Sequence, residues 1–251
     1  MSELELKMER WRYPRFFTEN ISDTAAVLDR EDSKHVSQVL RMRPGEFAVI
    51  CDGKGTDYLG RLESAEGECV FEILEKSPNQ AEPSVHLRLF QAMPKGDKME
   101  FVIQKSVELG VRKIVPFLSK NCVSRPDKTD KKVERWRKIA AEAAKQCGRG
   151  YLPVVTAVES AEKAFAMASD SGTALFFYEH ETRGLRETLE GQGVSDTVSL
   201  VVGPEGGFAP EEVQAAQNAG LSSVSLGTRI LRCETAPVAA LAAVLYAGGN
   251  M

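Results

Sequence analysis

Short strand-like stretches separated by turns dominate the first third of the chain. Residues 47–51 and 57–62 are strand candidates on either side of a glycine-containing turn, and residues 68–76 alternate apolar and polar positions. Such alternation is typical of strands with one buried face. Residues 32–41 instead place apolar side chains three and four positions apart, which predicts a helix. The pattern therefore predicts a small β-rich domain with one helix.

The pattern changes after residues 77–83, a stretch with two prolines and no apolar periodicity that we interpret as a linker. Beyond it, apolar runs of strand length alternate with helical patterns, which is typical of a parallel sheet covered on both faces. We therefore predict two domains, residues 1–77 and 78–251, and the second belongs to the α/β class. Its expected strands are 85–91, 113–118, 174–178, 199–202 and 222–226, and its expected helices are 98–109, 130–147, 210–219 and 236–246.

The last predicted helix, 236–246, is apolar on every side. A helix without a polar face has to be covered, either by its own domain or by another subunit. Its many alanines would let a second helix approach closely, which favours a contribution to a subunit interface.

Composition narrows the class of protein. Hydrophobic residues make up 43% and charged residues 27% of the 251 residues, as in ordinary globular proteins, so a wholly disordered or fibrous chain is excluded. No apolar run approaches the length of a membrane span, and residues 1–15 lack the apolar core of a signal peptide. The five cysteines lack CxxC spacing, which argues against a disulfide framework or zinc ribbon and favours the cytoplasm.

Charge is distributed unevenly along a chain whose net charge is −4. Residues 95–149 hold 15 Lys and Arg against 7 Asp and Glu, whereas residues 150–251 hold 5 against 12. A basic segment of this kind is expected either to bind a polyanion or to form a solvated helix surface. Charge alone leaves both interpretations open.

The segment 201–208, Val-Val-Gly-Pro-Glu-Gly-Gly-Phe, runs from an apolar strand into a glycine-rich loop. Glycines let a backbone approach a ligand closely. The helix that follows begins with Pro210, Glu211 and Glu212, residue types that suit a helix N-terminus. The two glutamates would repel a phosphate, which argues against a phosphate at this site. The alternative is a tight strand-to-helix turn without a ligand.

The segment 226–237, Leu-Gly-Thr-Arg-Ile-Leu-Arg-Cys-Glu-Thr-Ala-Pro, also joins a predicted strand to a helix. Its leucines and isoleucine could line a slot for a flat ring, with backbone amides facing the edges of the ring. Arg232 and Glu234 bring opposite charges to the same junction. The alternative is a helix cap with a structural Arg–Glu pair.

Several common sites are absent from the sequence. It contains no GxxxxGK[ST] phosphate loop and no GxGxxG after a strand, which removes the support for nucleotide hydrolysis and for a Rossmann cofactor. No GxSxG elbow is present either, although a Ser–His–Asp triad stays open. The three histidines, His35, His86 and His180, form no metal-ligand spacing with any cysteine, so no metal site is predicted.

The two segments together, in this order and spacing, resemble the small-subunit ribosomal RNA uridine-N3 methyltransferase family of the SPOUT superfamily. The resemblance extends over nearly the whole chain. Residues 15–17 and 35–45 are similar to the PUA-like RNA-binding domain of that family, and 94–96, 105–110 and 146–149 to its central signatures. The chain departs from the family pattern at Lys145, where a glutamate is usual, and at Thr228, where a proline is frequent.

The resemblance implies an S-adenosylmethionine cofactor, a homodimer, a C-terminal trefoil knot and methylation of a uridine of 16S rRNA in the small ribosomal subunit. The knot would be one of the rare exceptions to unthreaded topology. The cofactor is expected among three loops. Carried over to this chain, the cofactor residues are Tyr178, Glu179, Val202, Gly203, Pro204, Glu205, Gly206, Leu226, Gly227, Ile230, Leu231, Thr235 and Ala236.

Two residues are the candidates for catalysis. Uracil N3 is a poor nucleophile until its proton is removed, so we expect Arg232 to stabilise negative charge on the uracil carbonyls. Glu234 would either orient Arg232 or accept the proton. The predicted phosphate contacts are Arg15, Arg41, Arg43, Lys95, Lys105 and Arg149.

Three other functions stay open at this point. The first is an RNA-binding or ribosome-assembly factor that keeps the fold without catalysis. The second is a knotted methyltransferase that acts on another RNA or on ribose 2′-OH. The third is a small-molecule enzyme of another α/β type, against which the basic segment and the RNA-module-like first domain argue.

Overall fold

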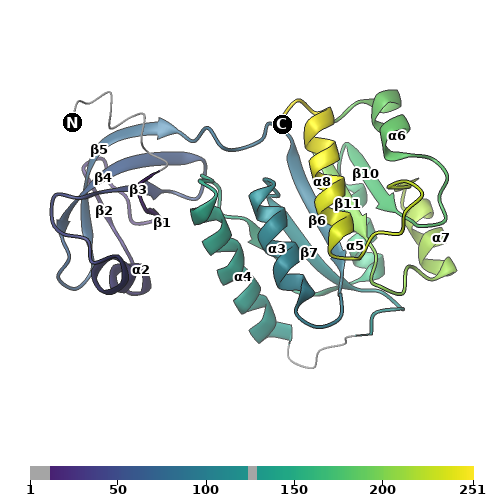
Figure 1. The fold of residues 1–251 in the computed structure, drawn as a ribbon, viewed down its shortest axis with the longest axis horizontal. Helices are drawn as coiled ribbons and strands as arrows, with labels where there is room; N and C mark the ends of the chain where they lie inside the picture. The colour runs from purple at the N-terminus through teal and green to yellow at the C-terminus, as the bar shows by residue number, and fades with distance from the viewer. Residues whose placement is uncertain (1–11, 124–128) are drawn as a thin grey trace. The chain divides into compact units, whose positions relative to one another are not determined.

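The computed structural model describes residues 12–123 and 129–251, which form two compact units (Figure 1). The first unit contains the described residues up to Glu82 together with 144–152. The second contains the described residues of 83–143 and 153–251. In the part of the chain that the structure describes, no helix is long and apolar enough to cross a bilayer.

The first unit is built on a five-stranded sheet in the order β1-β3-β4-β5-β2. Strands β1 and β3 are parallel and the other neighbours are antiparallel. Apolar side chains from one face of the sheet and from the helix pack into its core, among them Phe16, Val36, Ile50, Leu62 and Phe71. The β-rich domain with one helix is thus confirmed. The strands are β1 Arg15–Phe17, β2 Ala25–Val27, β3 Phe47–Cys51, β4 Thr56–Ser64 and β5 Val70–Pro78.

The helix of the first unit differs from the regular helix predicted over 32–41. It consists of α2, Arg30–Lys34, followed by a π-helical turn, η2, His35–Leu40. A π-turn adds a residue to the repeat, so the apolar positions drift away from a single face. Val36 is fully buried, whereas Val39 is 68% exposed. The predicted apolar face is therefore split between core and solvent.

The end of helix α4, Thr129–Gln146, and the turn after it belong to the first unit, although the sequence analysis placed them in the second domain. Lys145 Nζ lies 2.7 Å from Asp32 Oδ1, and Arg149 Nη2 lies 2.9 Å from Glu82 Oε2. The Asn79 amide also donates to the Gly148 carbonyl, at 3.0 Å. These polar contacts join positions far apart in the chain, and the spacing of apolar residues does not predict such contacts. The unit boundary accordingly follows Glu82 instead of Ser77.

The second unit contains a fully parallel sheet in the order β12-β10-β11-β6-β7-β8, and β9 pairs with β7. The predicted parallel α/β sheet is confirmed. The strand order reverses beside β6, and such switch points leave a crevice at the carboxyl ends of the strands. The strands are β6 His86–Ala92, β7 Lys113–Leu118, β8 Val154–Val155, β9 Glu159–Ser160, β10 Thr173–Phe177, β11 Thr197–Val202 and β12 Ser222–Val224.

Helices cover both faces of this sheet. Helix α8 packs against α3 and against strands β6 and β11, and α5 packs against the same two strands and against α7. Figure 1 shows α3 and α8 in front of the sheet. Helices α5 and α6 were not predicted, because the sequence analysis assigned no element to these stretches. The helices are α3 Lys98–Glu108, α5 Ala161–Ser169, α6 Leu185–Gln192, α7 Pro210–Asn218 and α8 Thr235–Ala247.

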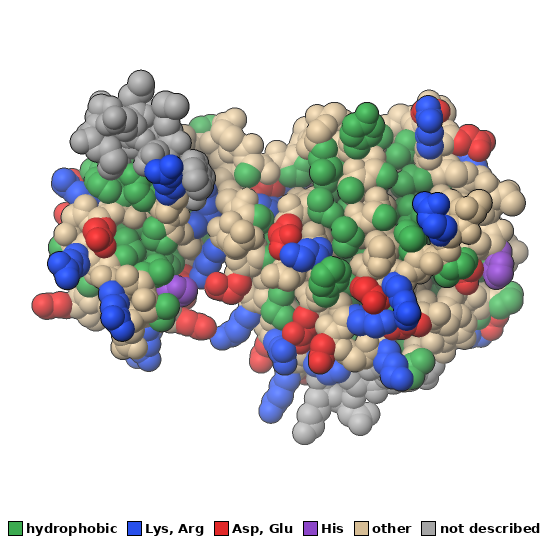
Figure 2. Space-filling model, in the orientation of Figure 1, with side chains coloured by type: hydrophobic (Ala, Val, Ile, Leu, Met, Phe, Trp, Pro, Cys, Tyr) green, Lys and Arg blue, Asp and Glu red, His purple; other side chains and the backbone are tan. Residues whose placement is uncertain are grey.

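Helix α8 is only partly covered within the unit. Ala240, Leu241 and Val244 are completely buried, so one side of the helix is core. Tyr246, on the opposite side, is 77% exposed, and Phe101 on the neighbouring α3 is also exposed. Figure 2 shows hydrophobic side chains gathered over this region. The prediction that the apolar helix is buried thus holds for one face, and the other face is open in a single chain.

Candidate functional site

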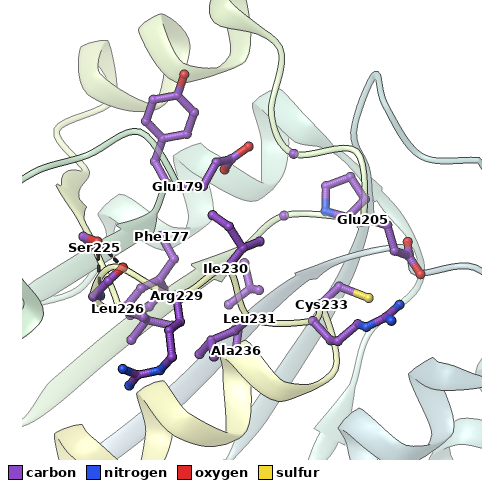
Figure 3. A pocket seen from close by; sticks show the side chains of 17 residues that line it. Phe177, Glu179, Glu205, Ser225, Leu226, Arg229, Ile230, Leu231, Cys233 and Ala236 are labelled. Carbon is purple, nitrogen blue, oxygen red and sulfur yellow. Dashed lines mark hydrogen bonds between the residues drawn. The ribbon is translucent and has the colours of Figure 1, made fainter.

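A pocket with a volume of about 370 Å³ lies at the carboxyl ends of β10, β11 and β12. Three loops form it: residues 178–179 after β10, residues 203–207 after β11 and residues 225–233 after β12. Figure 3 shows Ile230 and Leu231 between Ser225 and Leu226 on one side and Cys233 and Glu205 on the other. Both motif segments of the sequence therefore meet in one cavity.

Most of the predicted cofactor residues line this pocket. Gly206 and Thr235 do not, because Gly206 faces Asn121, whose amide donates to its carbonyl at 3.1 Å, and Thr235 begins α8 on an exposed side. The lining also includes Gly207, Arg229 and Cys233, which belong to the two motif segments but were not predicted to bind the cofactor. Phe177 and Ser225, which also line it, are each next to a predicted residue. The predicted residues that line it are Tyr178, Glu179, Val202, Gly203, Pro204, Glu205, Leu226, Gly227, Ile230, Leu231, Ala236 and, from the catalytic pair, Arg232.

The first glycine of the loop is required by close packing. A Cβ atom on Gly203 would lie 2.9 Å from Cε2 of Phe208. That ring cannot retreat easily, because its centroid is 4.3 Å from that of Phe176 and it is stacked with Phe117 at 6.4 Å. The loop backbone is therefore held directly on the aromatic core of the unit, which fixes the floor of the pocket.

The outer side of the glycine-rich loop is held by residues after β7. The Asn121 amide donates to the carbonyls of Gly206 and Gly207, at 3.1 and 3.2 Å. Glu212 in the first turn of α7 is buried and accepts from Ser119 Oγ and from the backbone N–H of Ala209, both at 3.0 Å. The acidic first turn seen in the sequence is thus a capping feature that braces the loop.

The Glu205 carboxylate is turned toward the start of α3. It accepts the backbone N–H of Lys95 at 3.1 Å and the ammonium group of Lys98 at 2.9 Å. Burial opposes ionisation, but these hydrogen bonds outweigh it and hold the pKa of Glu205 at about 2. Glu205 is therefore ionised at neutral pH and ties the pocket loop to residues 95–98.

Arg232 and Glu234 do not form the pair that was expected. Arg232 is exposed and lines the pocket, whereas Glu234 lies 3.2 Å from Lys98 Nζ and is not part of the lining. The chain turns here, since the N–H groups of Thr235 and Ala236 both donate to the Arg232 carbonyl at 2.9 Å. The two side chains serve different partners as a result. The proposed orientation of Arg232 by Glu234 is corrected accordingly.

The neighbouring thiol and carboxylate have shifted pKa values. Burial, together with the carboxylates of Glu234 and Glu205, raises the pKa of Cys233 to about 12, so the thiol stays neutral. It donates to Glu234 Oε2 at 3.2 Å. Burial of Glu234 opposes ionisation, but the hydrogen bonds from Cys233, its own backbone and Lys98 lower its pKa below the ordinary value. Glu234 is therefore a stable carboxylate and a weak base.

Two of the predicted RNA contacts are wrong for this structure. Arg15 is largely buried and bonds Asp57 at 2.7 Å, and Arg149 is 2% exposed and bonds Glu82. Their charges are neutralised inside the first unit, so neither is available to a phosphate. Lys105 is paired with Glu108 at 2.8 Å on the surface of α3. The remaining predicted contacts, Arg41, Arg43 and Lys95, are exposed.

The described residues contain no group of three His, Cys, Asp or Glu side chains that could hold a metal ion. All five cysteines are free.

Comparison with known proteins finds similarity over both units. A family model described as an RNA methyltransferase domain matches residues 81–245, and an RNA methyltransferase PUA domain model matches 28–74. The ribosomal RNA small subunit methyltransferase E of Bacillus subtilis is 32% identical over 226 residues, which cover 86% of this chain and 88% of the relative. The protein of the same name from Mycobacterium tuberculosis is 33% identical over 239 residues, covering 91% and 90%.

Two solved structures are similar along almost their whole length. The ribosomal RNA small subunit methyltransferase E from Neisseria gonorrhoeae, bound to S-adenosyl methionine, has a TM-score of 0.85 and 35% identity, covering 93% of this chain and 97% of that one. A Legionella pneumophila protein in complex with the cofactor SAM also has a TM-score of 0.85, with 30% identity, and covers 94% and 98%.

Proposed function

Since the chain belongs to the family of ribosomal RNA small subunit methyltransferases E, we propose that it transfers a methyl group from S-adenosylmethionine to N3 of a uridine in 16S rRNA. The observation that carries the proposal is the single pocket in which the loops 203–207 and 225–233 meet. Members of this family in other species are named methyltransferases, and the structure of one of them was solved with this cofactor bound.

The fold class predicted from the sequence is that of the family: a SPOUT-type α/β unit with a parallel sheet, preceded by a PUA-like β-rich unit. We propose that the first unit binds RNA and that the second carries the methyltransferase site. The trefoil knot stays a prediction.

The pocket suits S-adenosylmethionine in both shape and charge. Leu226, Leu231 and Ala236 offer apolar surface to a flat ring, and Ile230 at the pocket is 79% exposed, as expected of a side chain that a ligand would cover. The carboxylate of Glu179 favours a cationic ligand nearby. We propose that the cofactor is held by the predicted residues that line the pocket, and that Gly206 and Thr235 act only through the backbone course of their loops.

When bound, the cofactor supplies a methyl group on a positively charged sulfur. The acceptor N3 has to lose a proton, which places negative charge on the two uracil carbonyl oxygens. Two exposed guanidinium groups, those of Arg229 and Arg232, line the pocket, and we propose that Arg232 stabilises that charge. The low pKa of Glu234 makes it a poor acceptor for this proton, so we propose that the proton leaves to water.

The target uridine has to be unpaired or flipped out of a helix, because N3 lies on the pairing edge of the base. We propose that Arg41, Arg43 and Lys95 contact RNA phosphates, since all three are exposed. Small ribosomal subunits and their rRNA are then the partner, which places the protein in the cytoplasm. The five free cysteines are in keeping with that compartment.

The test is methylation by the purified protein. Radiolabelled S-adenosylmethionine is incubated with small ribosomal subunits from cells that lack the endogenous activity, and the rRNA is digested to nucleosides. Label in 3-methyluridine is expected. Label in a 2′-O-methylated or other nucleoside would overturn the acceptor atom. Cofactor binding without any label would instead favour a non-catalytic rRNA-binding factor.

We further propose that the chain forms a homodimer through the open face of α8 and α3. Tyr246 and Phe101 expose large apolar side chains there, which isolated monomers seldom gather on one face. Size-exclusion chromatography with light scattering should give twice the 27.5 kDa mass of one chain. Tyr246→Asp should shift the protein toward the single-chain mass. A wild-type protein that stays at 27.5 kDa at micromolar concentration would contradict the proposal.

A further inference from the structure

Lys98 links two loops of the pocket wall. It is the first residue of α3, and its Nζ lies 2.9 Å from Glu205 Oε1 and 3.2 Å from Glu234 Oε2. Glu205 belongs to the glycine-rich loop after β11, and Glu234 stands directly before α8. The ammonium group therefore joins three segments that are distant in the chain, through one carboxylate of each loop.

The two carboxylates depend on Lys98 to different degrees. Glu205 keeps a second partner, because both its oxygens accept the backbone N–H of Lys95, at 3.1 and 3.3 Å. Glu234 has the neutral thiol of Cys233 at 3.2 Å and its own backbone N–H. In the described part of the chain, its only ion pair is with Lys98. Loss of the lysine charge should therefore release the Glu234 segment more than the Glu205 loop.

A displacement of Glu234 would be transmitted to Arg232. The N–H groups of Thr235 and Ala236 hold the Arg232 carbonyl at 2.9 Å, so residues 232–236 form one tight turn. Arg232 carries its guanidinium group on the pocket wall from this turn. The glycine-rich loop, in contrast, is also held by Asn121 and by the packing of Gly203 on Phe208. The part of the site that depends on Lys98 is thus the part that carries Arg232.

We propose that Lys98 is a positioning residue, which fixes the turn at 232–236 against the glycine-rich loop so that Arg232 faces the methyl acceptor. The inference rests on the proposed function. A positioning role of this kind acts on the chemical step more than on cofactor binding. Displacement of a catalytic group by about 1 Å is enough to lower a rate by about 10²-fold.

The first test separates turnover from cofactor affinity. Lys98→Met removes the charge and keeps the length of the side chain, and it should lower kcat on small subunits by about tenfold or more. The Kd for S-adenosylmethionine, measured by calorimetry, should change by less than about threefold. Lys98→Arg keeps the charge and should recover most of the turnover. Adding Glu234→Gln to Lys98→Met should have little further effect, because both changes break the same link.

Lys163→Met is the matched control. Lys163 lies on α5 and is not part of the pocket lining, and its only ion pair among the described residues is with Glu159, at 2.8 Å. This variant should leave kcat unchanged. Three results would overturn the inference: unchanged kcat in Lys98→Met, an equal loss of kcat and cofactor affinity, or a Glu234→Gln effect that simply adds to that of Lys98→Met.

Hydrogen exchange tests the link without relying on turnover. Backbone amides of residues 232–236 should exchange faster in Lys98→Met than in the wild type or in Lys163→Met, while amides of 203–207 change less. Unchanged exchange at 232–236 would overturn the positioning role even if the enzyme is active. If Lys98→Met shows faster exchange but the wild type transfers no methyl group, the link through Lys98 would be supported and the proposed function would be rejected.

Discussion

Replacement of Arg232 by Ala is expected to lower kcat for rRNA methylation by about 10²–10³-fold, the usual effect of removing one preorganised charge-stabilising group. The guanidinium group lies on the pocket wall and is exposed, so it is free to approach the uracil carbonyls. Affinity for S-adenosylmethionine should change by less than about threefold, because other residues of the three loops form most of the wall.

The measurement is single-turnover methylation of small subunits, with the cofactor Kd determined separately by calorimetry. Arg186→Ala is the control, because Arg186 is exposed on α6 of the same unit, is paired there with Glu190 at 2.7 Å and is not part of the pocket lining. If Arg232→Ala binds the cofactor more weakly but reaches the full single-turnover rate at saturating cofactor, Arg232 would be assigned to cofactor binding instead. An unchanged rate would remove Arg232 from the mechanism.

The features that the sequence predicted well depend on local pattern. The parallel sheet follows from short apolar runs alternating with helical periods, and the strand register then brings the carboxyl ends of β10, β11 and β12 together. Both motif loops begin at these ends, so their meeting in one pocket follows from the fold. The glycine at 203 has a different reason from the expected approach of a ligand, since a Cβ atom there would meet the ring of Phe208.

The features that the sequence missed depend on long-range charge pairing. Arg15 reaches Asp57 over 42 positions, and Lys98 reaches Glu205 over 107. The sequence alone does not distinguish an exposed arginine from an arginine in a buried ion pair, because the fold determines which carboxylate lies next to it. The same limit hid the pairing of Glu234 with Lys98, because the adjacent Arg232 offered a nearer opposite charge.

Lys145 illustrates how a departure from the family pattern is accommodated. Its side chain, where the family usually has a glutamate, lies 2.7 Å from Asp32 and 5.9 Å from the centre of the Phe16 ring. Both partners belong to the first unit, as Lys145 itself does. The lysine therefore has a structural role at the end of α4, which the sequence could not assign because Asp32 lies on a different helix.

Replacement of Arg149 by Met is expected to lower the free energy of unfolding by about 3–5 kcal/mol, because it leaves a buried carboxylate without its cation. Glu82 is 8% exposed and Arg149 2%. The guanidinium group donates to Glu82 from Nε at 3.1 Å and from Nη2 at 2.9 Å. The same carboxylate accepts the backbone N–H groups of Gly150 and Tyr151, so it also fixes the turn after α4.

The difference in the free energy of unfolding is measured by urea unfolding of the wild type and the variant. The unfolding is monitored with a probe in the first unit. Arg186→Met is the control: it breaks a solvent-exposed pair with Glu190, and such pairs contribute about 0–1 kcal/mol. The double variant Arg149→Met with Glu82→Met should recover part of the stability, since a buried apolar pair avoids the unpaired charge. A stable Arg149→Met variant with weakened rRNA binding would contradict the structural role and restore Arg149 as a phosphate contact.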